Sequence, residues 1–199
     1  MARPMKFEKN EAVGKALEVF WNSSYAATTP QELVEGLGIG KGSLYNTFSS
    51  KRGLYDLTLA EYVRRRAEVL EATLRRPGSR IDALAAGIAV LVGLDMANPK
   101  GCFIVNAVAE HGEGDTVVAD ASANLFELIK RTFGTCLEAA VQEGEARSDL
   151  DVDQKASELL AIVIGSSILL RTGGDKSAVE GLVDGVLREL RSGEKASRS

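Results

Sequence analysis

Cysteine and histidine are scarce in this sequence of 199 residues, which contains only Cys102, Cys136 and His111. Two cysteines are too few for the disulfide framework of a small secreted domain. Together with one histidine, they also provide too few ligands for a structural zinc site. We therefore expect neither a metal ion nor another cofactor in this protein.

Long hydrophobic runs are missing as well. The richest apolar stretch, residues 159–170, has about half the length of a membrane-spanning helix and is interrupted by Ser166 and Ser167. The first ten residues contain no apolar core of the kind found in signal peptides. These features predict a cytoplasmic protein.

No segment alternates apolar and polar residues in the manner of a β-strand, whereas apolar residues recur throughout with the spacing of helices. The sequence therefore predicts an all-α fold of about nine helices. These cover approximately residues 8–21, 30–37, 41–48, 51–75, 79–97, 102–112, 115–143, 151–171 and 175–191. Residues 1–7 and 192–199 are expected to be disordered tails.

The net charge of −4 conceals a gradient along the chain. Residues 1–52 contain seven basic and five acidic side chains, whereas residues 53–199 contain 17 basic and 23 acidic ones. A mildly basic N-terminal part on an acidic remainder suits a protein that presents one end to nucleic-acid phosphates.

The second predicted helix begins with a complete capping signal. Thr29 can accept a hydrogen bond from the backbone N–H of Glu32, whose side chain can reach back to the N–H of Thr29, and Pro30 stands at the first helical position. Gly38 permits the left-handed conformation that closes the helix. With the short helix that follows, this segment matches a helix-turn-helix, although a plain helical hairpin would share the same pattern.

Residues 41–48 would form the recognition helix, because a second helix of this motif enters the major groove. Leu44 and Phe48 are four residues apart and are expected to face the core. The remaining side chains are free to contact bases and phosphates. The predicted DNA-binding residues are Thr29, Gln31, Lys41, Gly42, Ser43, Tyr45, Asn46, Thr47 and Lys51.

Residues 8–60 closely resemble the N-terminal domain of the tetracycline-repressor (TetR) family. The resemblance rests on the string Gly-Ile-x-Lys-Gly-Ser-Leu-Tyr-x-x-Phe-x-x-Lys over residues 38–51, preceded by the aromatic and capping residues of 20–29. Gly40 and Gly53 depart from the family pattern, in which serine and glutamate are common at these positions. Glycine is a tolerable N-cap, so neither difference threatens the assignment.

The resemblance implies a homodimeric regulator with a DNA-binding head at residues 8–52 and a body at 53–191. The body would hold a small effector and form the dimer through its last two helices. We expect a repressor that is released from a palindromic, double-stranded operator by a small, rather apolar compound. The expected dimer residues are Leu160, Ile164, Ile168, Val179, Val183 and Val186, although both helices could instead bury their apolar side chains within one protomer.

A second motif, Gly101-Cys102-x-x-Val105-Asn106, resembles a box found in a subgroup that includes electrophile- and oxidant-sensing repressors. A thiol at a helix N-terminus beside a lysine can become reactive. The alternatives are therefore a thiol sensor at Cys102 and a buried small side chain. The candidate effector-pocket residues are Cys102, Phe103, Asn106, His111 and Phe126, although His111 could instead cap the end of its helix.

Two other functions are weighed against a regulator. An enzyme with Cys102 as its nucleophile would need a base, but His111 is nine positions further along the same predicted helix and out of reach. A ligand carrier without DNA binding would have no use for an intact recognition helix. We therefore expect a regulator and not an enzyme.

Overall fold

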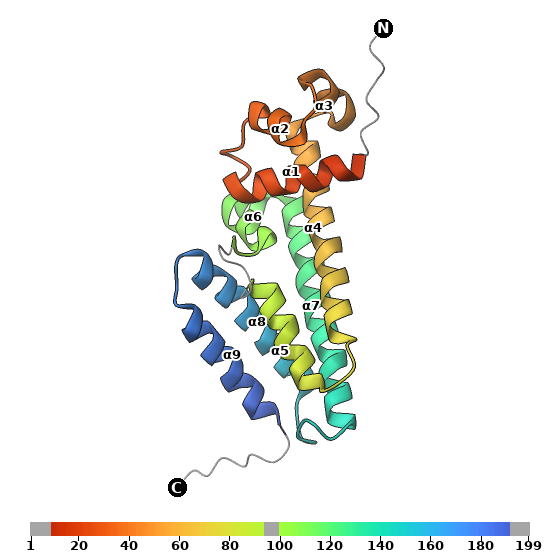
Figure 1. The fold of residues 1–199 in the computed structure, drawn as a ribbon, viewed down its shortest axis with the longest axis vertical. Coiled ribbons are helices and arrows are strands. Elements are labelled where there is room, and N and C mark those ends of the chain that lie inside the picture. Colours follow the sequence, from red (N-terminus) through yellow and green to blue (C-terminus); the bar gives the residue numbers. More distant parts are fainter. Residues whose placement is uncertain (1–8, 94–99, 192–199) are drawn as a thin grey trace. The chain divides into compact units, whose positions relative to one another are not determined.

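The computed structural model describes residues 9–93 and 100–191, so the predicted terminal tails lie outside the described residues. Within these ranges the secondary structure is helical, apart from one isolated bridge between Ala146 and Arg191. The elements are α1 Lys9–Ser23, α2 Pro30–Leu37, α3 Lys41–Phe48, α4 Lys51–Leu74, α5 Arg80–Val92, α6 Phe103–His111, the 3₁₀ turn η1 Gly112–Gly114, α7 Thr116–Gln142, α8 Val152–Arg171 and α9 Lys176–Leu190 (Figure 1). The predicted all-α fold is confirmed.

Most helix ends lie at capping residues. The backbone N–H of Asp82 donates to the Ser79 hydroxyl at the start of α5, and the N–H of Gln154 donates to Asp151 at the start of α8. The predicted end of the fifth helix near residue 97 is wrong. Gly93 closes α5 earlier because it adopts a left-handed φ of 76°.

The chain divides into two compact units, and α4 and α7 contribute to both. The first unit contains α1, α2, α3, the part of α4 up to Arg65, α6, η1 and the first residues of α7. It is larger than the head predicted at residues 8–52, because residues 53–65 and 103–122 also belong to it. Its core is rich in aromatic rings, among them the fully buried Phe20 and Tyr55, whose ring centroids are 5.1 Å apart.

The second unit contains the rest of α4, α5, the main part of α7, and the hairpin of α8 and α9. In this unit α5 packs against both α8 and α9 (Figure 1). The core is built mainly from aliphatic side chains, such as Leu84, Ile88 and Leu159, which are completely buried. Among the described residues, no helix combines the length and apolarity that a membrane crossing requires.

Candidate nucleic-acid interface

The predicted capping box at the start of α2 is present. The N–H of Glu32 donates to the Thr29 hydroxyl at 3.2 Å, and the N–H of Thr29 donates to the Glu32 carboxylate at 2.6 Å. The backbone N–H and the hydroxyl of Thr29 both donate to the Glu32 carboxylate, and these two hydrogen bonds hold the pKa of Glu32 below its usual range. The box sets the position at which α2 begins, and Gln31 on its first turn is exposed and donates to Glu35 at 2.7 Å.

Two glycines shape the turn between α2 and α3. Gly38 has a left-handed φ of 68°, and its N–H donates to the Val34 carbonyl at 3.0 Å. Gly40 is the N-cap of α3 and has extended backbone angles without a side-chain cap. Because the turn needs only three residues, α3 follows α2 closely, as a helix-turn-helix requires.

The two faces of α3 differ as the sequence predicts. Leu44 and Phe48 are 3% and 4% exposed, and they anchor the helix in the first unit. On the outer side, Lys41, Gly42, Ser43 and Asn46 are exposed, whereas Tyr45 and Thr47 are partly exposed. A short helix with one buried face and one polar outer face can present side chains to a DNA groove without losing its own support.

A tight turn joins α3 to α4. Ser49 has φ 64° and ψ −41°, and the N–H of Ser50 donates to the Phe48 carbonyl at 2.7 Å, which makes Ser49 the centre of a γ-turn with positive φ. The Ser50 hydroxyl then accepts from the N–H of Gly53 at 2.9 Å. A Cβ at Gly53 would lie 2.7 Å from the Phe48 carbonyl oxygen, so the turn as it stands favours glycine at this position.

Lys51, a predicted phosphate ligand, is the first residue of α4. Its ammonium lies 4.5 Å from the centre of the Tyr25 ring and also acts electrostatically on Glu32. The ring contact holds the lysine at the N-terminus of a helix, where backbone N–H groups favour an anion. The arrangement therefore places one positive charge beside the start of α2.

Sequence reasoning missed how the loop between α1 and α2 is held. The carboxylate of Glu110, in α6, accepts hydrogen bonds from the backbone N–H groups of Tyr25 at 3.0 Å and Ala26 at 2.6 Å. This loop leads directly into the Thr29 cap, so Glu110 fixes the approach to the helix-turn-helix. No local signal in the sequence could have identified this contact, because its partners are 84 and 85 residues apart.

A second long-range contact secures the start of α4. The guanidinium of Arg52 forms two hydrogen bonds with Asp115, one of them at 2.6 Å, and its Nε donates to Asp56 at 2.6 Å. Arg52 holds the pKa of Asp115 down to about 2. Asp115 also accepts from the first turn of α7 through Val118, so one carboxylate links α4 to the beginning of α7.

His111, predicted for the effector pocket, lies in the aromatic cluster of the first unit. Its ring centre is 5.1 Å from that of Tyr25 and 5.3 Å from that of Tyr55, and its Nδ1 is 3.3 Å from Asp115. Phe103, another candidate, is buried in the same cluster, 5.7 Å from Tyr62. These two side chains therefore support the DNA-binding unit itself.

The remaining effector candidates are divided between the two units. Asn106 belongs to the first unit, whereas Cys102 and Phe126 belong to the second, and all three are partly exposed. Neither of two cavities described in the second unit is lined by any of the five predicted residues. Other side chains line these two cavities, and the pocket of five residues stays a prediction.

The two cysteines differ in their surroundings. Cys102 is partly exposed and directly precedes α6, whereas Cys136 is buried in α7. Burial raises the pKa of the Cys136 thiol to about 11, so this group stays protonated near neutral pH.

The predicted dimer residues separate into two groups. Val179 and Val183 are 2% and 4% exposed and pack inside the protomer, so they leave the proposed interface. Leu160, Ile164 and Val186 are partly exposed, and Ile168 is 47% exposed. Two other large apolar side chains on α8 and α9, Leu169 and Leu182, are 51% and 45% exposed.

Comparison with known proteins gives consistent matches over nearly the whole chain. Residues 13–57 match the family described as bacterial regulatory proteins, tetR family, and residues 77–186 match the tetracyclin repressor-like C-terminal domain. The HTH-type transcriptional repressor ComR of Escherichia coli is 30% identical over 86% of this chain and 83% of its own length. The HTH-type transcriptional repressor BdcR of E. coli is 37% identical over 66% of each chain.

Solved structures show the same fold. The TetR family transcriptional regulator CifR, in a cysteine-substituted form complexed with 26-bp double-strand operator DNA, is 25% identical with a TM-score of 0.76 and covers 95% of this chain and 100% of its own. The reduced form of E. coli NemR has a TM-score of 0.80 at 16% identity, covering 90% of this chain and 95% of its own. The helix-turn-helix and the helical body are thus found together in these proteins as they are here.

Proposed function

The chain belongs to the tetR family of bacterial regulatory proteins and is a DNA-binding transcriptional regulator, and we propose that it is a repressor released from a palindromic operator by a small molecule. The observation that carries this proposal is the polar outer face of α3, which is supported from below by the buried Leu44 and Phe48. ComR and BdcR are both described as repressors, which supports the proposal of a repressor over an activator. Such a protein would act in the cytoplasm, where operator DNA is found.

We assign base reading to Lys41, Tyr45 and Asn46 on α3. Lysine can donate to guanine, asparagine can pair with adenine, and tyrosine can contact a phosphate or a thymine methyl group. Lys51 and Thr29, near the starts of α4 and α2, are placed to contact phosphates, which set the register of the protein on the duplex. Gln31, Gly42, Ser43 and Thr47 complete the proposed contact surface.

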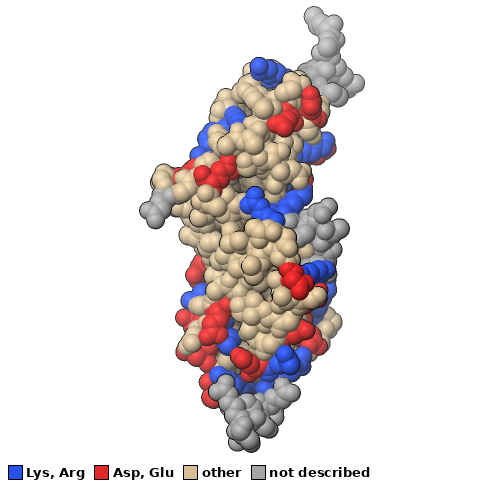
Figure 2. Space-filling view, turned by 90° about the vertical axis from the view of Figure 1, so that its left-hand side faces the viewer, with Lys and Arg blue, Asp and Glu red and all other residues tan. Residues whose placement is uncertain are grey.

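A second copy of the chain would complete the binding unit. Ile168, Leu169 and Leu182 expose large apolar side chains on α8 and α9. Figure 2 shows that the surface of this helix pair is largely uncharged at its centre and bordered by charged residues. Burial of this surface in a two-fold dimer would present two recognition helices about 34 Å apart, one turn of the DNA helix.

Release from the operator would follow from a shift between two states of this dimer. We propose that the effector binds in the body and favours a position of α4 in which the two recognition helices no longer match successive major grooves. Because α3 is joined to α4 by the short turn at Ser49, a change in α4 reaches α3 directly.

Binding to the DNA that flanks its own coding sequence tests the proposed function. In a gel-shift titration at fixed salt, the wild-type protein should retard this fragment more strongly than a scrambled fragment. Tyr45→Ala should weaken specific binding by about tenfold or more, because a base contact is worth roughly 1–3 kcal/mol. Circular dichroism should show unchanged helix content, since the side chain of Tyr45 is partly exposed.

The salt dependence separates base contacts from phosphate contacts. Lys51→Ala should weaken binding to all sequences and reduce the slope of log K against log salt by about one. Lys176→Ala is a matched control, because this lysine is 53% exposed on α9 and belongs to the other unit. If Tyr45→Ala and Lys51→Ala both bind the fragment like the wild type, the proposed interface is in the wrong place.

A further inference from the structure

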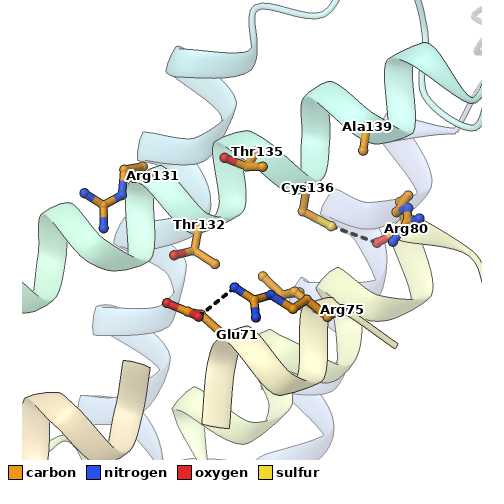
Figure 3. A pocket seen from close by; sticks show the side chains of 9 residues that line it. Glu71, Arg75, Arg80, Arg131, Thr132, Thr135, Cys136 and Ala139 are labelled. Atoms are coloured by element: carbon orange, nitrogen blue, oxygen red, sulfur yellow. Dashed lines mark hydrogen bonds and ion pairs between the residues drawn. The ribbon is translucent and has the colours of Figure 1, made fainter. Parts of the chain in front are cut away.

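A cavity of about 400 Å³ lies in the second unit, between the last turns of α4, the start of α5 and the middle of α7 (Figure 3). Its lining combines arginine, glutamate, threonine and cysteine side chains with two aliphatic ones. The volume is sufficient for a small organic molecule. The cavity is thus large enough to be considered as an effector site, and its lining decides which ligand it suits.

The charges around the cavity do not cancel. Arg75 pairs with Glu71 at 3.0 Å, and Arg80 pairs with Glu143 at 3.0 Å. Arg131 also lines the cavity, is exposed, and makes no ion pair with any residue that the structure describes. One guanidinium therefore remains uncompensated, which favours a ligand that carries a single negative charge.

Hydrogen-bond donors accompany this charge. Thr135 follows Arg131 by one helical turn on the same side of α7, and both line the cavity (Figure 3). The planar guanidinium of an arginine donates two parallel hydrogen bonds to a carboxylate, and a threonine hydroxyl can add a third. The Cys136 thiol beside them donates to the Arg80 carbonyl and adds no negative charge at neutral pH, because burial raises its pKa to about 11.

The rest of the lining suits a compact apolar group. Leu74 is 6% exposed and Ala139 is partly buried, and both contribute aliphatic surface to the cavity. An apolar effector is expected from the sequence, and this aliphatic surface could hold the apolar part of such a ligand. The arginines add a requirement for an acidic group at the other end.

We infer that this cavity binds the effector and that the effector is a small organic acid, whose carboxylate is held by Arg131 and Thr135. The inference rests on the proposed function only in calling the ligand an effector. A singly charged carboxylate matches the one uncompensated guanidinium better than a doubly charged phosphate monoester. The planar, two-pronged geometry of arginine likewise suits a carboxylate.

Calorimetric titration of the full-length protein measures binding without DNA. The probes are acetate, butyrate, benzoate and phenylacetate, with benzamide as the uncharged counterpart of benzoate and phenyl phosphate as the doubly charged one. At constant ionic strength, at least one carboxylate should bind with a dissociation constant below about 1 mM, and benzamide and phenyl phosphate should bind more weakly. Failure of all four carboxylates, or equal binding of benzamide, would overturn the inference.

The variant R131Q locates the site. It should lower the affinity for the best carboxylate by about tenfold or more, because it removes a charge-assisted hydrogen bond. The control R147Q changes an arginine in the same unit that is 54% exposed and does not line the cavity, and it should bind the probe like the wild type. Equal losses in both variants, or no loss in R131Q, would show that the acid binds elsewhere.

Operator release is then measured with the same acid. The wild-type complex should dissociate when the acid is added at constant ionic strength, whereas the R131Q complex should need about ten times more acid. Binding of the acid without any effect on the operator complex would overturn its role as an effector. If no DNA fragment binds, the proposed function fails, while the calorimetric result still decides whether the cavity takes an acid.

Discussion

The two compact units of this protein bury different kinds of side chain. The first unit contains most of the aromatic residues, and the ring pairs Phe20–Tyr55 and Trp21–Tyr62 meet edge to face. In the second unit only Phe126 and Phe133 are aromatic, and aliphatic residues form most of the core. Aromatic pairs prefer particular geometries, whereas aliphatic contacts depend mainly on volume. The first unit, which contains the helix-turn-helix, thus has the core whose contacts depend more on the orientation of the side chains.

In both units, nevertheless, the carboxylate of a glutamate distant in sequence accepts backbone N–H groups near the start of a helix. Glu110 in the first unit accepts two backbone N–H groups of the loop before α2, and Glu145 in the second accepts those of Arg80 and Ile81 at the start of α5. The packing therefore differs between the units, whereas both use a glutamate carboxylate to accept backbone N–H groups that would otherwise be unpaired.

The largest expected effect comes from the core of the first unit. Phe20→Ala should destabilise that unit by about 3–5 kcal/mol, because it empties a fully buried site between aromatic rings. Trp21 is the single tryptophan of the chain and belongs to this unit, so its fluorescence should change at a lower urea concentration than the far-UV circular dichroism. Leu84→Ala, in the second unit, should reverse this order. Coincident transitions in both variants would mean that the units unfold together.

The two glutamates that accept backbone N–H groups, Glu110 and Glu145, can be compared directly. Glu110→Gln and Glu145→Gln each weaken an acceptor for two backbone donors and should cost about 1–3 kcal/mol. Hydrogen exchange should accelerate at Tyr25 and Ala26 in the first variant and at Arg80 and Ile81 in the second. Glu110→Gln should in addition weaken operator binding, whereas Glu145→Gln should leave it unchanged in the absence of effector. Loss of DNA binding in both would argue against a local role for Glu110.

Acid should affect the first unit through Asp115. The pKa of this carboxyl is held at about 2, below its usual 3.8, by Arg52. A depressed pKa stabilises the fold above about pH 4, and this contribution disappears as the pH falls toward 2; allowing for solvent screening it is on the order of 1 kcal/mol. Urea titrations monitored by Trp21 between pH 5 and 2.5 should show a smaller loss of stability in Asp115→Asn. An unchanged pH profile in this variant would assign the acid sensitivity to other carboxylates.

The smallest expected effect concerns the cap of the recognition helix. Gly40→Ser should stabilise the first unit by a few tenths of a kcal/mol, because a serine hydroxyl can accept the N–H that glycine leaves unpaired. A Cβ at this position meets no other atom within 4 Å. Thermal unfolding should therefore show a slightly higher midpoint, and a lower one would indicate that the extended backbone at Gly40 does not tolerate a side chain.

The sequence was sufficient where the deciding signals are local. The box of Thr29 and Glu32, the turn at Gly38 and the buried pair Leu44 and Phe48 were all predicted, because each depends on neighbours within a few residues. The support from Glu110 was not predictable, since it depends on tertiary packing between distant segments.

The body was harder to predict for a related reason. Val179 and Val183 were expected at a dimer interface but are buried in the protomer. Apolar spacing shows that a helix has surfaces to bury, yet it does not show which of them faces the protomer core. Arg131 is likewise an ordinary charged residue in the sequence, and only the fold places it around one cavity with Arg75 and Arg80.

The turn at Ser49 has one further consequence. A non-glycine residue with φ 64° has little conformational latitude, and Ser50 immediately caps the next helix, so the junction cannot behave as a loose hinge. Helix α3 is instead connected rigidly to the first turn of α4. Because α4 follows α3 without a flexible linker, we expect a rotation of α4 to change the angle at which the proposed base-reading residues Tyr45 and Asn46 approach DNA.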